Sequence, residues 1–259
     1  MVNVLYFVFL FLFLCFFYFS KSGKNIGKWC FSLADAKEFL SKSWMIYAGS
    51  IFAVINLKID NVMIKWTLGS EAVGKYAVAS TLSEAWYFVP IAIVTVLFPR
   101  LIKLKEINEK LYAKKLQQLF DLLMALSILV AISITVVSSF FIEQLYGHQY
   151  LISSQVLVVH IWGGVFIFMR SLVSKWILIE EKYFFSMFSQ GLGAIMNILL
   201  NLYLIPKYGI IGAAYATVVS YAFSSYFALL IYQPAHKLFL MMSMSFLFPL
   251  RLISQIIKN

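Results

Sequence analysis

Residues 44–68 read WMIYAGSIFAVINLKIDNVMIKWTL, a run in which most residues are apolar. About 20 consecutive apolar residues are enough to cross the hydrocarbon core of a bilayer as an α-helix. The rest of the 259-residue chain has the same character: 62% of it is hydrophobic and its mean hydropathy is +0.87. Soluble domains contain roughly 45–50% apolar residues. The sequence therefore predicts an integral membrane protein.

Similar apolar runs occur along the whole chain and predict an all-α polytopic bundle of about seven transmembrane helices. The first run, within residues 1–43, forms a leading helix followed by a basic loop, and six more runs form a lobe over residues 44–232. The tail, 233–259, is predicted to lie at the interface or to add a weak eighth span, because Pro249 and Arg251 interrupt its apolar run. The seven predicted spans are residues 2–19, 44–67, 76–99, 117–142, 154–179, 183–205 and 210–232.

The net charge of +10 reflects basic residues that are distributed unevenly between the predicted loops. The loops at 20–43 and 100–115, the stretch around 170–182 and the tail hold 17 of the 21 lysines and arginines, all on one predicted side. Cytoplasmic loops are enriched in basic residues, so this side is predicted to be cytoplasmic, with the C-terminus inside and the N-terminus outside. Anionic lipid headgroups, not nucleic acid, are the expected partners of this charge.

Charged side chains inside the predicted spans are the strongest functional signal. A lysine or aspartate near the bilayer centre costs about 2.5–3.5 kcal/mol, so such residues usually face a cavity or a partner. Lys58, Asn61 and Lys65 share one helix face, whereas Asp60 points about 200° away from Lys58. Lys58 and Asn61 are therefore predicted to face a substrate cavity, and Lys65 to reach the external interface.

Further charged residues extend this candidate site. Glu84 and Asp60 are predicted to couple transport to an ion. For Glu84, the options are that it pairs with Lys58 or that it carries a coupling proton. Arg170 and Lys175 are predicted to bind an anionic substrate, since the planar guanidinium of arginine suits pyrophosphate. A structural ion pair for Glu84 and an interfacial anchor for Arg170 are the alternatives. No His, Cys and carboxylate spacing indicates a metal site, and no cofactor or catalytic residue is expected.

Two stripes of small or amide residues indicate close helix packing. Gly212, Ala216, Ser220 and Ser224 recur every four residues, which allows another helix to approach closely. A second, mildly polar stripe faces protein or water, and interhelical hydrogen bonding explains it at least as well as ligand contact; it comprises Gln190, Asn197 and Asn201.

Three segments carry a resemblance to a known family: IDNVMIKWTLGSEAVGKYAVASTLSEAWYFVPIAIVTVLFPRL (59–101), LYGHQY (145–150) and NILLNLYLIPKYGIIGAAYATVVSY (197–221). Residues 44–232 resemble the polysaccharide (O-antigen) flippases of the multidrug/oligosaccharidyl-lipid/polysaccharide exporter superfamily. The resemblance implies two six-helix lobes around a cationic cavity, and outward movement of undecaprenyl-pyrophosphate-linked sugar units across the bacterial inner membrane. It also implies that this chain corresponds to a C-terminal lobe, with a separate N-terminal lobe and polysaccharide assembly proteins as partners.

Other functions fit the sequence less well. A lipid-linked sugar transferase needs a large external loop or paired interfacial carboxylates, and the longest predicted external loop, 143–153, carries only Glu143. A multidrug exporter lobe of the same superfamily is expected to favour carboxylates over lysines in its lumen. A nonfunctional remnant of a split flippase gene is the remaining alternative. The expected function is thus transport without a covalent step.

Overall fold

The computed structural model describes residues 2–22 and 32–248, which divide into two compact units, Met1–Lys42 and Ser43–Asn259. The first unit contains α1 (Val2–Ser22), whose section Leu5–Ser20 is apolar, and the start of α2 (Leu33–Leu68). The candidate site lies wholly in the second unit.

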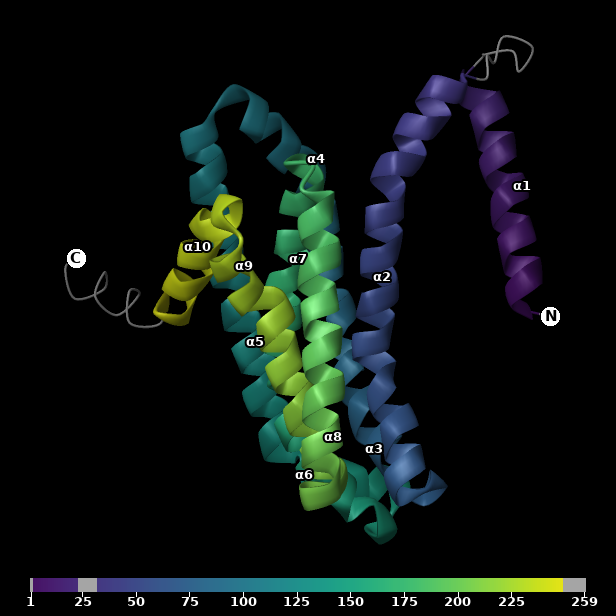
Figure 1. Cartoon of the computed structure of the whole chain (residues 1–259), viewed down its shortest axis with the longest axis vertical. Helices are drawn as coiled ribbons and strands as arrows, with labels where there is room; N and C mark the ends of the chain where they lie inside the picture. The colour runs from purple at the N-terminus through teal and green to yellow at the C-terminus, as the bar shows by residue number, and fades with distance from the viewer. Residues whose placement is uncertain (1, 23–31, 249–259) are drawn as a thin grey trace. The chain divides into compact units, whose positions relative to one another are not determined.

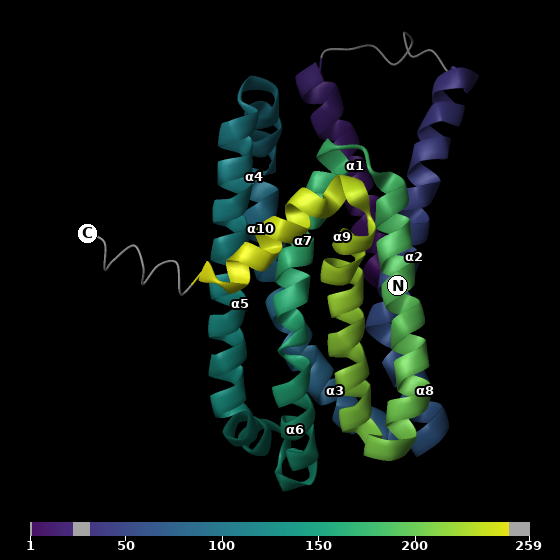
Figure 2. The ribbon, with the colours of Figure 1, turned by 60° about the vertical axis from the view of Figure 1, so that its left-hand side comes forward.

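The second unit is helical throughout its described residues, and its long helices run side by side (Figures 1 and 2). Four described helices are long and apolar enough to cross a membrane, and a bent helix pair makes a fifth. The chain is therefore a multi-pass helical membrane protein. After α2 the elements are α3 (Ser70–Glu84), η2 (Ala85–Tyr87), α4 (Phe88–Ile107), α5 (Glu109–Tyr146), η3 (His148–Tyr150), α6 (Leu151–His160), α7 (Gly163–Ile179), α8 (Tyr183–Ala222), the π-helical η4 (Phe223–Phe227), α9 (Ala228–Ile231), η5 (Gln233–Ala235) and α10 (His236–Phe246).

The predicted spans 183–205 and 210–232 appear as two arms of the continuous helical stretch α8 to α9. Gly209 interrupts it with φ 60° and ψ −142°, a left-handed conformation that glycine adopts without a Cβ clash. Asn201 and Thr217 both contact the carboxylate of Asp60, although a straight helix would separate them by about 24 Å. The two arms therefore lie antiparallel, and Figure 2 shows the reversal at the lower end of α8.

Basic loops and glycine turns lie at opposite ends of this unit. Lys105 contacts Glu180, and Lys237 lies 3.8 Å from Glu109, so the loops after α4 and α7 and the start of α10 gather at one end. Gly69 and Gly147, both with positive φ, turn the chain at the other end. The structure thus brings together the basic segments around 100–115 and 170–182 and the start of α10. The predicted basic loop 20–43 belongs almost wholly to the first unit, and residues 23–31 and 249–259 lie outside the described part.

Prolines and local breaks modify the helices in the middle of the chain. The 3₁₀ turn η2 directly precedes the segment of Pro90, a residue that cannot donate a backbone hydrogen bond and crowds the preceding turn. Pro99 was expected to end its helix, and this expectation is wrong: α4 continues through Pro99 to Ile107. The predicted span 154–179 is bent by 45° between α6 and α7, at Ile161 and Trp162.

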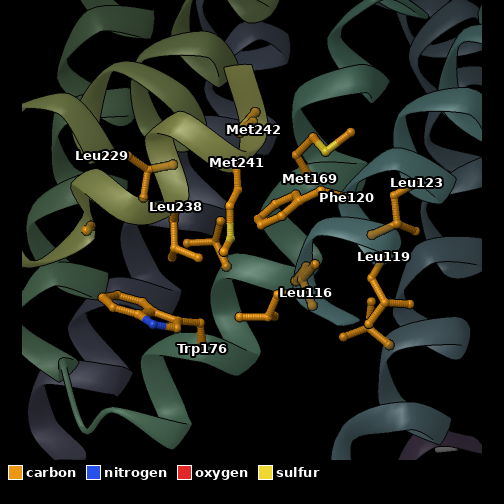
Figure 3. Packing of buried hydrophobic residues seen from close by; sticks show 14 of the residues in the cluster. Leu116, Leu119, Phe120, Leu123, Met169, Trp176, Leu229, Leu238, Met241 and Met242 are labelled. Carbon is orange, nitrogen blue, oxygen red and sulfur yellow. The ribbon is translucent and has the colours of Figure 1, made fainter. Parts of the chain in front are cut away.

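Two apolar clusters hold the unit together. The larger joins α4, α5, α7 and α10, and Figure 3 shows Phe120 of α5, Met169 of α7 and Met241 of α10 converging in it. The smaller joins α2, α3, α6 and α8 around Ile64 and Tyr76. At 11 residues, α10 is too short to span a bilayer, and Figure 2 shows it running obliquely across α5. Its backbone is tied to α5 by Gln117, whose amide donates to the carbonyl of Met241.

Candidate functional site

The candidate site is built on two opposite faces of α2. Lys58 lies ten residues before the helix end at Leu68, about 15 Å along the axis, which is half of a hydrocarbon core of about 30 Å. Its Nζ donates to Glu84 Oε2 at 2.7 Å, and the two side chains are 52% and 19% exposed. Val54 and Val62, one turn to either side of Lys58, are also exposed. A charged pair therefore lies near the middle of the predicted span 44–67, on an exposed face of α2 that also carries Asn61 and Lys65.

The opposite face of α2 carries Asp60, which is 1% exposed. Its carboxylate accepts hydrogen bonds from Asn201 Nδ2 at 2.5 Å, Thr217 Oγ1 at 2.6 Å and Tyr76 Oη at 2.9 Å. These partners come from both arms of α8 and from α3, so one side chain joins three helical segments. Within the described residues Asp60 has no lysine, arginine or histidine within 4 Å.

A second polar layer lies one helical turn from Asp60, on the side of Asn56. The amide of Asn197 donates to the side-chain oxygen of Asn56 at 3.0 Å and to its backbone carbonyl at 2.9 Å. Ser220 Oγ donates to the same side-chain oxygen at 2.9 Å. The polar stripe read from Asn197 and Asn201 thus makes interhelical hydrogen bonds, one of the two roles expected from the sequence.

Close approach of the helices in this layer depends on Gly193. A Cβ built at this position would lie 2.6 Å from Ser224 Cβ and 2.9 Å from Asn56 Nδ2, well inside van der Waals contact. The small residues of the two arms therefore permit the spacing that the amide and hydroxyl hydrogen bonds need.

Arg170 and Lys175 lie apart from the Lys58–Glu84 pair. Arg170, on α7, is 6% exposed; its Nη1 donates to Ser189 Oγ at 2.9 Å and to the carbonyl of Ser224 at 3.3 Å. Lys175 holds its Nζ 5.0 Å from the ring centroid of Phe98 on α4. The structure thus separates the predicted residues into an exposed pair, a buried carboxylate cluster and a buried arginine.

Sequence reasoning did not include Asn56, Tyr76 or Thr217 in the candidate site. Asn56 and Asp60 are four residues apart, and so are Asn197 and Asn201. This equal spacing was the available signal that Asn56 could face Asn197 while Asp60 faces Asn201. His160 is buried between the rings of Tyr76 and Tyr221 at centroid distances of 6.0 and 6.5 Å, as a packing residue would be. In the described chain no three His, Cys, Asp or Glu side chains gather as a metal site.

Comparison with known proteins finds a family model that matches part of the chain and a solved structure with a similar fold. The family model for polysaccharide biosynthesis proteins matches residues 1–105. An uncharacterized membrane protein, MJ1068 of Methanocaldococcus jannaschii, is 27% identical over 181 residues, which cover 68% of this chain and 34% of that protein.

Among solved structures, the inward closed conformation of the lipid II flippase MurJ has a similar fold, with a TM-score of 0.62 at 18% identity. The match covers 89% of this chain and 51% of MurJ, so the chain spans about half the length of that flippase and about a third of the curated relative. The family match covers residues 1–105, less than half of this chain, and the likeness to MurJ shows its fold.

Proposed function

We propose that the chain is one lobe of a flippase that moves undecaprenyl-pyrophosphate-linked O-antigen or other polysaccharide repeat units across the bacterial inner membrane. The observation that carries the proposal is the Lys58–Glu84 pair, which lies at mid-span on an outward-facing helix surface. A charged pair in direct contact with lipid tails is unfavourable, so we expect a second lobe or a water-filled cavity to cover this face.

Lys58 is proposed to hold the pyrophosphate of the substrate. A lipid pyrophosphate carries at least two negative charges, and cationic hydrogen-bond donors must replace its water as it passes the apolar helices. Half of the Lys58 side chain is accessible, so an incoming phosphate oxygen can reach Nζ without unfolding the helix. Asn61, on the same face and half-buried, supplies an amide near this position.

Glu84 is proposed to link substrate binding to an ion. An arriving pyrophosphate competes with Glu84 for Lys58, and a largely buried carboxylate that loses its cationic partner needs another positive charge, which a coupling ion can supply. Substrate release then lets Lys58 pair with Glu84 again. Glu84 is thus expected to exchange a coupling ion for a salt bridge during each cycle.

Asp60 is proposed as a second ion-coupling carboxylate. A buried carboxylate without a cationic partner is costly, and it is stabilised either by protonation or by a bound cation. Other oxygens lie in the same network: Thr217 Oγ1 contacts both the Asp60 carboxylate and the carbonyl of Ala213, and Asn197 Oδ1 accepts from the amide of Asn201. The side-chain oxygen of Asn201 is buried without a hydrogen-bond partner. Oxygen sets of this kind suit hard cations, and transporters bind coupling ions near the membrane midplane.

Lys175 stays in the proposal as a further cationic residue for the anionic substrate. Arg170, which is 6% exposed, is not proposed to contact the substrate. Membrane lipids, a separate N-terminal lobe and polysaccharide assembly proteins are the proposed partners. The basic ends of α4, α7 and α10 are proposed to face the cytoplasm.

Transport can be tested in a cell that lacks its own flippase and therefore lacks surface polysaccharide. The chain is expressed together with a complementary N-terminal lobe, and surface polysaccharide and resistance to lipophilic cationic drugs are both measured. The proposal predicts restored polysaccharide and unchanged drug resistance. Drug resistance without polysaccharide would favour the multidrug exporter alternative, and the absence of both despite normal membrane insertion would favour a nonfunctional remnant.

A further inference from the structure

A buried cation without a counter-ion occupies a cavity behind the proposed transport face. Arg170 is 6% exposed, and no carboxylate lies within salt-bridge distance of its guanidinium in the described chain. Its two hydrogen bonds go to neutral oxygens, Ser189 Oγ and the carbonyl of Ser224, and its Nε has no partner. Because a buried charge without compensation is costly, this guanidinium favours a nearby anion.

The cavity beside Arg170 has a volume of about 160 Å³. It lies between α2, α7, α8 and η4, and Arg170 is its only charged lining residue. Its other polar lining groups are amides and hydroxyls, including Asn56, Gln190, Tyr221 and Ser225. Ser225 Oγ is buried without a hydrogen-bond partner, like Arg170 Nε. The cavity thus combines one positive charge with neutral groups that can donate hydrogen bonds.

We propose that this cavity binds one small monovalent anion of chloride size, held by Arg170. A water molecule occupies about 30 Å³, so the cavity has room for such an ion with a few waters. A pyrophosphate joined at one end to a lipid and at the other to a sugar is far larger than this space. The anion is therefore distinct from the phosphate that Lys58 is proposed to hold, and the inference does not depend on the proposed transport function.

Binding of the anion stabilises a particular arrangement of helices. Arg170 already connects α7 to α8 through Ser189 and to η4 through the carbonyl of Ser224. An anion in the cavity also contacts the α2 wall, which Ala53, Asn56 and Leu57 form. The ion thus links the helix that carries Lys58 to the π-helical segment η4, a type of irregular helix often found at functional sites.

Thermal unfolding of the purified full chain in detergent tests the inference. The wild type is compared in chloride, bromide and nitrate with gluconate, an anion too large for the cavity, at equal ionic strength. We expect the midpoint to rise with the concentration of each small anion and to stay constant in gluconate, because a ligand that binds only the folded state stabilises it. Equal midpoints in chloride and gluconate would overturn the inference.

Three variants assign the effect to the cavity. Arg170→Gln should weaken the apparent anion affinity roughly tenfold or more, since it removes a charge-assisted hydrogen bond. Ala53→Leu should fill the cavity from α2 and abolish the anion dependence while leaving Arg170 and its partners intact, which covers the case in which Arg170→Gln fails to fold. Lys103→Gln, which removes an exposed positive charge on α4, is the matched control and should respond like the wild type.

The nature of the anion is tested separately. Anomalous scattering from bromide-soaked crystals should place one ion beside Arg170. An unchanged anion response in both Arg170→Gln and Ala53→Leu, or a bromide elsewhere only, contradicts the assignment. Stronger stabilisation by inorganic phosphate or pyrophosphate than by chloride would also overturn it and would assign the site to the phosphate of the substrate.

Discussion

Replacing Asp60 by asparagine separates a structural role of this side chain from a role in cation binding. Asparagine has nearly the same shape and keeps an oxygen that can accept hydrogen bonds from Tyr76 and Thr217. It removes the negative charge that would hold a cation. Asp60→Ala instead removes all three hydrogen bonds, and at about 0.6 kcal/mol for each interhelical bond in a membrane protein the loss is about 2 kcal/mol.

A bound cation adds a further contribution to the free energy of unfolding, and this contribution depends on the concentration of the cation. A ligand at one hundred times its dissociation constant stabilises the folded state by about 2.7 kcal/mol. The wild-type chain should therefore gain up to that amount in NaCl or KCl, relative to choline chloride at the same ionic strength. Both variants should lose this gain, whereas only Asp60→Ala should be clearly destabilised in choline chloride.

Both quantities are measured by unfolding the detergent-solubilised protein with heat or with denaturant. Keeping chloride constant in all buffers holds the proposed Arg170 anion site equally occupied. The reasoning is refuted if Asp60→Asn retains the cation dependence of the wild type. A wild type that is equally stable in all three salts would likewise contradict a cation bound at Asp60.

Two further predictions concern packing and topology. Gly193→Val should destabilise the chain by about 1–3 kcal/mol, because the valine side chain has no space against α2 and the second arm of α8. Gly74→Ala is the control: its new Cβ meets no atom within 4 Å, so the free energy of unfolding should change by less than about 1 kcal/mol. Equal losses of stability in the two variants would contradict the close packing at Gly193. Reporter fusions should be cytoplasmic at Glu109 and external at Gly147, because the basic loops gather at the end that holds Glu109, and the reverse result would exclude the proposed orientation.

The sequence was sufficient to predict the helices, because the length of an apolar run that crosses a membrane and the periodicity of a helix are both local properties of the chain. The opposite faces of Lys58 and Asp60 follow from the 100° step of the helix, and the structure shows one side chain exposed and the other buried. The Lys58–Glu84 contact, one of the options left open, also appears. The helical class of these segments, and the helix face on which Lys58 and Asp60 each lie, could thus be predicted from the sequence alone.

The tertiary partners required the fold. Asp60 meets Thr217 only because the chain reverses at Gly209, and no local pattern states which helix lies beside α2. The break between α6 and α7 was missed because the apolar run continues through Ile161 and Trp162, although Gly163 and Gly164 follow directly. Pro99 was misread because a proline can remain inside a membrane helix when other groups satisfy the carbonyl it leaves free.

The central claim is that Lys58 binds the anionic part of a transported lipid-linked substrate, and export by Lys58→Ala tests it most directly. The variant is made in the chain co-expressed with its complementary lobe, and surface polysaccharide is measured together with the amount of protein in the membrane. The account predicts that Lys58→Ala abolishes export at near-normal abundance, that Lys58→Arg retains part of it, and that Lys65→Ala, near the helix end, does much less. Normal export by Lys58→Ala, or a loss of export that only follows a loss of protein from the membrane, would contradict the account.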